Sequence, residues 1–375
     1  MVILSDIVII FLLINIILAM ILKARGEETD LIFGKYRKSL TKVYPGLSKE
    51  EIGTLLSEGW SRPYTYEPFT LFKEGPYHGQ YVHVDRNGFR ATKNQGPWPP
   101  APGHFNVFLF GGSTAFNYGL PDDQTIASYL QDFLMNVEIG KPVCVYNFGR
   151  GHYYSSQEFV LFHRLLASGF IPDMAIFIDG LNEFYHNDDR PYFSKRIDKF
   201  ISTENNASYR RLFFQMLYKL PVVRIAKKTP PRLKESEDTY QNGSVISRVI
   251  HTYVENKKLI EAVSGIYSVT PVFVWQPVPT YKYDLKYHLF APASFGEHTY
   301  SKYGYPRMAE FVKKELPVKN FLWCADIQEG LQEPLYVDSV HYTAEMSKKL
   351  AQKIGHLLLE RNLLVTSHLK KPGLL

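Results

Sequence analysis

A serine, a histidine and a carboxylate in this chain have the residue types that nucleophilic acyl chemistry requires. Ser113 follows an apolar run over 107–110 and two glycines, and the carboxyl end of a strand is where α/β sheets hold reactive groups. Near the C-terminus, Asp338 stands three residues before His341. This spacing lets the carboxylate hold one ring nitrogen while the other nitrogen faces Ser113. A serine hydroxyl activated in this way attacks carbonyl carbon.

Each of these features also has an ordinary structural explanation. Gly and Ser are frequent in strand-to-helix turns for conformational reasons, and a His just ahead of a helix is often a capping or surface residue. Phosphate binding is another alternative for the turn at 111–112. It is disfavoured because neither Gly-Lys-Ser/Thr nor Gly-x-Gly-x-x-Gly follows the strand.

The elements that would position these residues alternate between strand and helix. Apolar runs predict buried strands over 107–110, 143–148, 174–178 and 272–275. Helical spacing and capping signals predict four helices. The first runs from 126, with Asp122 and Asp123 at its N-terminal end, and the second follows a cap at Ser156. The third covers 250–263, and the fourth begins at about Thr343. Such alternation indicates a mostly parallel sheet with helices on both faces. Ser113, the 149–151 turn and Asn182 would then meet at one edge of the sheet.

Composition limits the classes of protein that this chain can be. A hydrophobic content of 45% with 21% charged residues is typical of a folded protein. The net charge of +6 is modest and spread out, so nucleic acid is not expected as a partner. Two cysteines provide no disulfide framework, and Cys144 is expected in the core. Asp179 and Glu183 flank Asn182 without a His or Cys cluster, so no metal is expected and both should have supporting or surface roles.

The N-terminal region predicts a membrane anchor. The stretch Ile7–Leu22 is free of charge and approaches the length that a membrane span needs, so residues 1–26 are expected to be a single anchor. Basic residues follow it, which by the positive-inside rule would hold the large domain in the cytoplasm. An envelope role would place that domain on the other side, and the sequence leaves this open.

The remaining chain divides into two parts. Residues 27–102 are expected to be a linker and a β-rich lead-in packed on the main domain, with a helix opened by a capping box at Ser48 and a strand over 81–85. The main domain, 103–375, contains an insertion at about 186–245. Its basic amphipathic stretch 209–220 would be either a helix packed on the core or an interfacial helix on an anionic membrane.

Four short blocks of this chain resemble those of the SGNH/GDSL hydrolase superfamily, in the same order. They are Gly-Gly-Ser-Thr at 111–114, Asn-x-Gly-x-Gly at 147–151, Gly-x-Asn-Glu at 180–183 and Asp-x-x-His at 338–341. The resemblance implies a three-layer α/β/α flavodoxin-like fold. It also implies that Ser113 is the nucleophile, that His341 is the base and that Asp338 orients the ring.

The same resemblance implies the residues of an oxyanion hole. Its donors would be the Ser113 N–H, a backbone N–H of the second block and the Asn182 side-chain amide. Gly151 is named for the second block, with His152 as its rival, because alignment from Asn147 puts His152 where many members have the oxyanion Gly.

The predicted function is ester hydrolysis by a serine mechanism without a metal or organic cofactor. The expected substrate carries an acetyl or other acyl ester on cell-envelope carbohydrate or on lipid. One alternative is an O-acyltransferase that uses the same site and passes the acyl group to a hydroxyl. The other is a non-catalytic envelope scaffold, in which Ser113 and His341 would lie outside hydrogen-bond reach.

Overall fold

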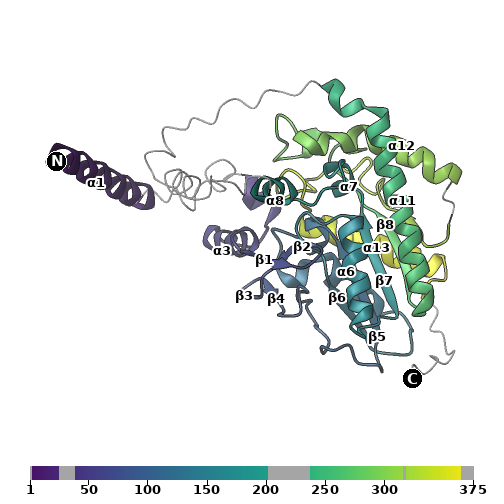
Figure 1. The fold of residues 1–375 in the computed structure, drawn as a ribbon. Helices are drawn as coiled ribbons and strands as arrows, with labels where there is room; N and C mark the ends of the chain where they lie inside the picture. The colour runs from purple at the N-terminus through teal and green to yellow at the C-terminus, as the bar shows by residue number, and fades with distance from the viewer. Residues whose placement is uncertain (1, 25–38, 202–236, 316–317, 365–375) are drawn as a thin grey trace. The chain divides into compact units, whose positions relative to one another are not determined.

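A computed structural model describes residues 2–24, 39–201, 237–315 and 318–364 (Figure 1). The chain divides into two compact units, residues 1–37 with 193–237 and residues 38–192 with 238–375. The described elements of the first unit are α1 (Val2–Ala24) and α8 (Ser194–Ile201). The anchor predicted over 1–26 coincides with α1 and extends beyond the described residues at both ends. Within the described ranges, no helix combines the length and the apolarity needed to span a membrane.

The second unit is built on a five-stranded parallel sheet. Its strands are β5 (Phe105–Gly111), β6 (Val143–Asn147), β7 (Met174–Asp179), β8 (Thr270–Trp275) and β9 (Phe321–Trp323). They lie in the order β6-β5-β7-β8-β9, and every pair is parallel. Counted along the chain this is the order 2-1-3-4-5 of flavodoxin-like sheets, whose ligands bind where the strand order reverses, between the first and third strands. The predicted parallel α/β architecture is confirmed, and β5 and β7 flank its switch point.

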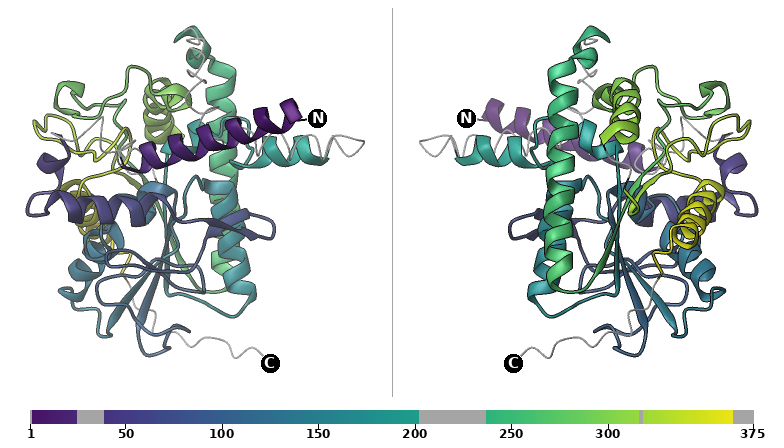
Figure 2. Two further views of the ribbon diagram at one scale, coloured as in Figure 1. Left: turned by 90° about the vertical axis from the view of Figure 1, so that its left-hand side faces the viewer. Right: turned by 90° about the vertical axis from the view of Figure 1, so that its right-hand side faces the viewer.

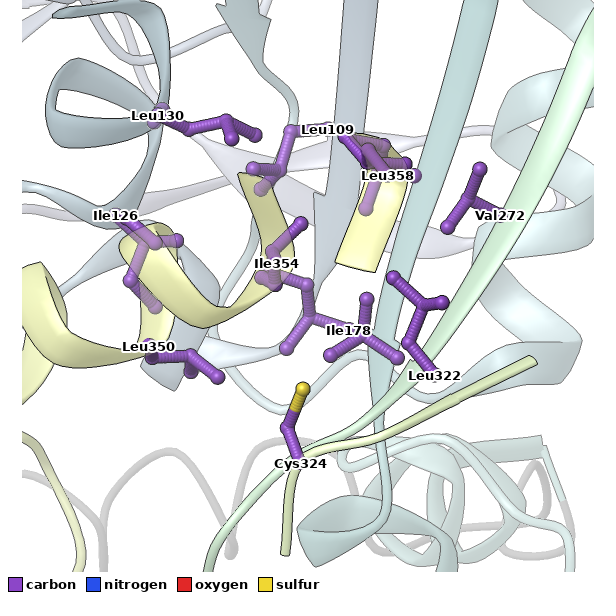
Figure 3. Close-up of a cluster of buried hydrophobic side chains, with 14 of the residues drawn as sticks. Leu109, Ile126, Leu130, Ile178, Val272, Leu322, Cys324, Leu350, Ile354 and Leu358 are labelled. Atoms are coloured by element: carbon purple, nitrogen blue, oxygen red, sulfur yellow. The ribbon is translucent and has the colours of Figure 1, made fainter. Parts of the chain in front are cut away.

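Two helices cover one face of the sheet. α5 (Ile126–Met135) and α13 (Ala344–Glu360) pack against it through a continuous apolar cluster (Figure 3). Leu350, Ile354 and Leu358 recur every fourth residue and are fully buried, because that spacing keeps them on the sheet-facing side of α13. Burying each such side chain stabilises the fold by about 1.5–3 kcal/mol.

The opposite face carries α6 (Ser155–Ala167) and α11 (Gly243–Ile266), so that α11 and α13 lie on opposite sides of the sheet (Figure 2). Aromatic rings fill this side. Phe177 stacks on Phe110 with 4.9 Å between ring centroids, and on Phe273 with 5.5 Å. Together the two layers of helices make the predicted α/β/α arrangement.

The described part of the lead-in, from residue 39 on, lies in the same compact unit as the sheet. It contains α3 (Lys49–Trp60), β1 (Tyr64–Glu67), β2 (Leu71–Glu74), β3 (Tyr77–His78) and β4 (His83–Val84). The capping box of Ser48 and Glu51 is present. The strand predicted over 81–85 is shorter than expected. The N–H groups of Gln80, Tyr81 and Val82 donate to the buried Glu58 carboxylate instead of to a neighbouring strand.

The predicted start of α5 at residue 126 is confirmed, but the role predicted for Asp122 at that helix end is wrong. Thr125 caps α5, whereas Asp122 lies in a preceding 3-10 turn, η1 (Asp122–Gln124). The Asp122 carboxylate is bound by the Arg90 guanidinium and the His83 ring, so long-range ion pairing replaces the expected helix-end role. The predicted cap of α6 is also wrong, because Tyr154 caps this helix, two residues before Ser156. Its expected cap, Ser156, donates instead to the Asp189 carboxylate.

Several elements were not predicted. β9 has only three residues and α4 (Ser113–Phe116) only four, too few for a periodic pattern. α12 (Tyr300–Glu315) contains Pro306, which argues against a helix from sequence. The other short elements are α7 (Leu181–Tyr185), η2 (Glu237–Gln241), η3 (Leu285–Tyr287) and η4 (Gly296–Thr299). The amphipathic stretch 209–220 lies outside the described residues.

Candidate active site

Ser113 lies at the carboxyl end of β5, as the first residue of α4. The strand can turn into this helix because Gly111 has φ +152°, and a side chain there would overlap Ala115 and Ile178. Ser113 is half-buried. Neither its hydroxyl nor its N–H makes a hydrogen bond with any described residue. Both groups are therefore available to a ligand.

Asn182 lies directly beside this turn. It belongs to α7, which follows β7, and only 6% of its surface is exposed. Its side-chain amide donates to the Tyr153 carbonyl oxygen over 2.6 Å. A side chain on Gly112 would place its first carbon 2.1 Å from the Asn182 amide nitrogen, so glycine is required for this close approach. The sheet thus brings the first and third sequence blocks into contact.

Asp338 and His341 form the expected carboxylate–imidazole pair. Asp338 Oδ2 lies 2.7 Å from His341 Nδ1, and Asp338 Oδ1 accepts the N–H groups of Val340 and His341. Burial alone would raise the pKa of Asp338. The pKa is nevertheless lowered, because the His341 ring and these N–H groups stabilise the carboxylate. His341 Nε2 is buried without a hydrogen-bond partner among the described residues.

Tyr118 contacts both the serine and the histidine. Its N–H donates to the Ser113 carbonyl oxygen over 3.2 Å, and its ring meets the His341 ring edge-on with 5.6 Å between centroids. Trp60 stacks on Tyr118 and also meets His341 edge-on at 5.0 Å. No hydrogen bond joins the Ser113 hydroxyl to His341 within the described residues. Such bonds are often long before a substrate is bound.

The second block is tied to α4, to the end of β5 and to the lead-in. The Asn147 side chain donates to the Ala115 carbonyl oxygen and accepts the Gly149 N–H, and the Arg150 N–H donates to Gly111. The Gly151 N–H donates to the buried Glu74 carboxylate over 3.0 Å, so it is committed away from an oxyanion.

His152 is the residue of this turn whose N–H remains available. It has φ +62°, and its N–H has no acceptor in the described part of the chain. A left-handed φ is one that glycine adopts more readily than other residues.

Three further histidines, His152, His186 and His298, have lowered pKa values. The pKa of His152 is lowered to about 3 and those of His186 and His298 to about 4. Burial is the main cause for all three, and for His152 and His298 repulsion from His341 adds to it. These rings are neutral near neutral pH.

Asp179 and Glu183 are buried rather than at the surface, and with Glu158 they form a carboxyl cluster beneath the site. Glu183 accepts the N–H groups of Ser155 and Gly180. Burial raises the pKa of all three carboxyl groups, and for Glu158 and Asp179 mutual repulsion within the cluster raises it further. No group of His, Cys, Asp and Glu side chains among the described residues is arranged to hold a metal ion.

Sequence reasoning missed three residues that shape the site. Trp60 and Glu74 belong to the lead-in, far in sequence from the four blocks, and Tyr118 follows α4 in a loop without periodicity. No short-range pattern distinguishes them, because their role depends on contacts between the lead-in and the sheet.

Comparisons with known proteins find no matching family model and no matching curated protein. Solved structures with a similar arrangement are found. A member of the lipolytic protein G-D-S-L family from Veillonella parvula DSM 2008 is 10% identical, with a TM-score of 0.35, over 70% of this chain and 99% of its own. The psychrotrophic esterase EstA from Pseudoalteromonas sp. is 9% identical, with a TM-score of 0.33, over 68% of this chain and 97% of its own.

The lipase Lip_vut3 from goat rumen metagenome is 10% identical, with a TM-score of 0.38, over 68% of this chain and 97% of its own. All three are named as lipolytic proteins, esterases or lipases.

Proposed function

We propose that this chain is a serine-dependent ester hydrolase of the SGNH/GDSL type. One observation carries the proposal. His341 is held through Nδ1 by Asp338, its buried Nε2 has no partner among the described residues, and Tyr118 contacts both this ring and Ser113. A ring held through Nδ1 with Nε2 unpartnered is what the base of a serine nucleophile needs.

The reaction begins with attack of Ser113 Oγ on the ester carbonyl carbon. The hydroxyl proton passes to His341 Nε2, and Asp338 stabilises the imidazolium that forms. The tetrahedral intermediate collapses to an acyl-enzyme as His341 returns the proton to the departing alcohol. Water, activated by His341, then releases the acid and regenerates Ser113.

Three donors are proposed for the developing oxyanion. They are the N–H groups of Ser113 and His152, which have no acceptor among the described residues, and the second amide hydrogen of Asn182, whose first is taken by the Tyr153 carbonyl oxygen. His152 replaces Gly151 in this proposal because the Gly151 N–H is bound to Glu74.

The substrate proposed is an acyl ester on envelope carbohydrate or lipid, and the predicted anchor at 1–26 would hold the enzyme at a membrane. Trp60, 38% exposed and in contact with His341, supports a substrate with an apolar face. A hydrolase transfers the acyl group of the acyl-enzyme to water, whereas an acyltransferase transfers it to another hydroxyl. Product analysis with and without added oligosaccharide would distinguish them.

The test is hydrolysis of p-nitrophenyl acetate by the purified protein beside Ser113→Ala and His341→Ala. Ser156→Ala and His251→Ala are matched controls, because both side chains lie away from the site. We expect the rate to be lost in the first pair and kept in the second, with unchanged circular dichroism. Equal rates in all five proteins, or a wild type that neither hydrolyses the ester nor labels with a fluorophosphonate at Ser113, would contradict the proposal.

A further inference from the structure

Glu74 is a buried carboxylate that the mechanism above does not use. It ends β2 of the lead-in hairpin and is only 2% exposed. Its Oε1 accepts the Gly151 N–H over 3.0 Å and also the Tyr118 hydroxyl, while its Oε2 lies 3.3 Å from Arg62 Nη2. A charge so deeply buried is tolerated only when it is paired and hydrogen-bonded. Arg62 supplies the opposite charge and is itself buried.

On one side, Glu74 holds the turn that carries the proposed oxyanion donor. Its bond to the Gly151 N–H fixes the Arg150–Gly151 peptide group, which directly precedes the peptide that carries the His152 N–H. A side chain on Gly151 would overlap the hydroxyls of Tyr64 and Tyr118, so this turn packs directly on the Glu74 cluster. From the other direction, the Arg150 N–H donates to Gly111 over 2.9 Å. The turn at 149–151 is therefore held on one side by the lead-in and on the other by the end of β5, the strand that precedes Ser113.

On the other side, Glu74 accepts the hydroxyl of Tyr118, the residue that contacts both Ser113 and His341. Burial and the nearby Glu74 raise the pKa of Tyr118 well above its ordinary value, so its hydroxyl stays protonated and donates to Glu74. The same residue contacts His341 with its ring and Ser113 with its N–H. The Glu74 carboxylate is thus hydrogen-bonded both to the turn that carries the oxyanion donor and to Tyr118.

We propose that Glu74 is a positioning residue of the active site. It joins the lead-in to the turn that carries the oxyanion donor and to Tyr118, which contacts both Ser113 and His341. This inference rests on the proposed hydrolase function. It makes the lead-in hairpin a working part of the site, although the hairpin contributes no atom to the reaction.

The test compares Glu74→Ala and Glu74→Gln with Glu67→Ala. Glu67 is a matched control because it lies on the same hairpin and is also paired with cations, Lys73 and Arg164, and its ion pairs reach neither Gly151 nor Tyr118. We expect Glu74→Ala to lower kcat about 10- to 100-fold and to leave KM within about twofold of the wild type. This loss in kcat is smaller than the ~10²–10³-fold loss that follows removal of a whole oxyanion donor. Glu67→Ala should stay within about twofold of the wild type.

The conservative variant separates positioning from folding. Gln keeps an oxygen that can accept the Gly151 N–H, so Glu74→Gln should recover most of the kcat that Glu74→Ala loses. If Glu74→Ala does not fold, Glu74→Gln and Tyr118→Phe decide the matter. Each should lower kcat several-fold at unchanged KM, and wild-type kcat in both would overturn the inference.

Hydrogen exchange keeps this test independent of the proposed function. Backbone amides of 149–154 should exchange at least about tenfold faster in Glu74→Ala than in Glu67→Ala, whether or not the protein hydrolyses esters. Serine-dependent hydrolysis with equal kcat in the two variants would overturn the role of Glu74 and leave the hydrolase standing. Absence of hydrolysis with unchanged exchange would overturn both. Absence of hydrolysis with faster exchange would overturn the hydrolase, and with it the catalytic role of Glu74, and would leave only the structural hold of Glu74 on the turn.

Discussion

Asp338 fixes the His341 ring in one orientation, with 2.7 Å between Oδ2 of the first and Nδ1 of the second. A carboxylate accepts hydrogen bonds and donates none, so this contact assigns the ring proton to Nδ1 and leaves Nε2 as the acceptor. The lowered pKa of Asp338 keeps the carboxylate ionised throughout the neutral range. The histidine is therefore prepared to take a proton on the nitrogen that has no partner among the described residues.

Asp338→Asn should abolish most of the activity without unfolding the protein. The Asn oxygen can still accept the Val340 and His341 N–H groups, but its NH₂ would face Nδ1 and favour the wrong tautomer. We expect kcat for p-nitrophenyl acetate to fall about 10³–10⁴-fold. Asp284→Asn, at an exposed position, serves as the control. A rate within tenfold of the wild type would argue against an ionised Asp338 as the orienting group.

Asn182→Ala should remove one proposed oxyanion donor. We expect kcat to fall about 10²–10³-fold with a small change in KM, because the interaction strengthens only as charge develops on the oxygen. Asn187→Ala changes the same residue type at an exposed contact with Glu297 and should keep the wild-type rate. Equal rates in the two variants would remove Asn182 from the site.

His152→Gly should keep the activity, because the proposed donor is a backbone N–H. Glycine also adopts φ +62° without the strain that other residues carry there. Ser268→Gly, at an exposed position with φ +56°, is the matched control. Steady-state kinetics should give both variants kcat within a few-fold of the wild type. A loss above about 30-fold in His152→Gly alone would mean that the imidazole itself acts.

Arg90→Ala should destabilise the whole domain. The fully buried guanidinium donates to the Asp122 carboxylate and to the carbonyl oxygens of Phe116, Asn117 and Leu120 in the loop after α4. Removing it leaves these acceptors unpaired, at an expected cost of about 3–5 kcal/mol in the free energy of unfolding. Urea unfolding beside Arg86→Ala, at an exposed position, measures the difference. A difference in the free energy of unfolding below about 1 kcal/mol would show that the hydrogen bonds of Arg90 are not needed for stability.

Glu158→Gln should change how stability depends on pH. Burial raises the pKa of Glu158 above its ordinary value of 4.5. Above pH 4.5 the folded state therefore keeps a proton that the unfolded state releases, so this group contributes a free energy of unfolding that falls as pH rises toward the folded pKa. Gln carries no such proton and removes the contribution.

Urea midpoints between pH 5 and pH 8 test this expectation. Relative to Glu158→Gln, the wild type should lose stability as pH rises over that interval. The neutral histidines impose the opposite slope below pH 6.5, but they are present in both proteins and cancel in the difference. Glu310→Gln, at an exposed position, should follow the wild type. Parallel curves for wild type and Glu158→Gln would contradict the raised pKa.

The sequence by itself determined the sheet, because each central strand is a continuous apolar run. The runs at 107–110, 143–148, 174–178 and 272–275 became β5 to β8, and alternation with helices correctly indicated parallel pairing. Parallel strands align their carboxyl ends, so the positions of Ser113 and Asn182 near one another also followed from the order of the blocks. The Asp338–His341 contact is local and could be predicted from its spacing of three residues.

Only the tertiary structure decided which groups complete the site. Gly151 and His152 are neighbours in one turn, and the choice between them depends on where Glu74, 77 residues earlier, places its carboxylate. Tyr118 and Trp60 lie beside His341 because the lead-in packs against the sheet. Likewise, the depth at which Asp179 and Glu183 are buried depends on α6 and α11 covering them. Contacts between segments far apart in sequence leave no periodic pattern in either segment. These residues could therefore be assigned to the site only from the tertiary structure.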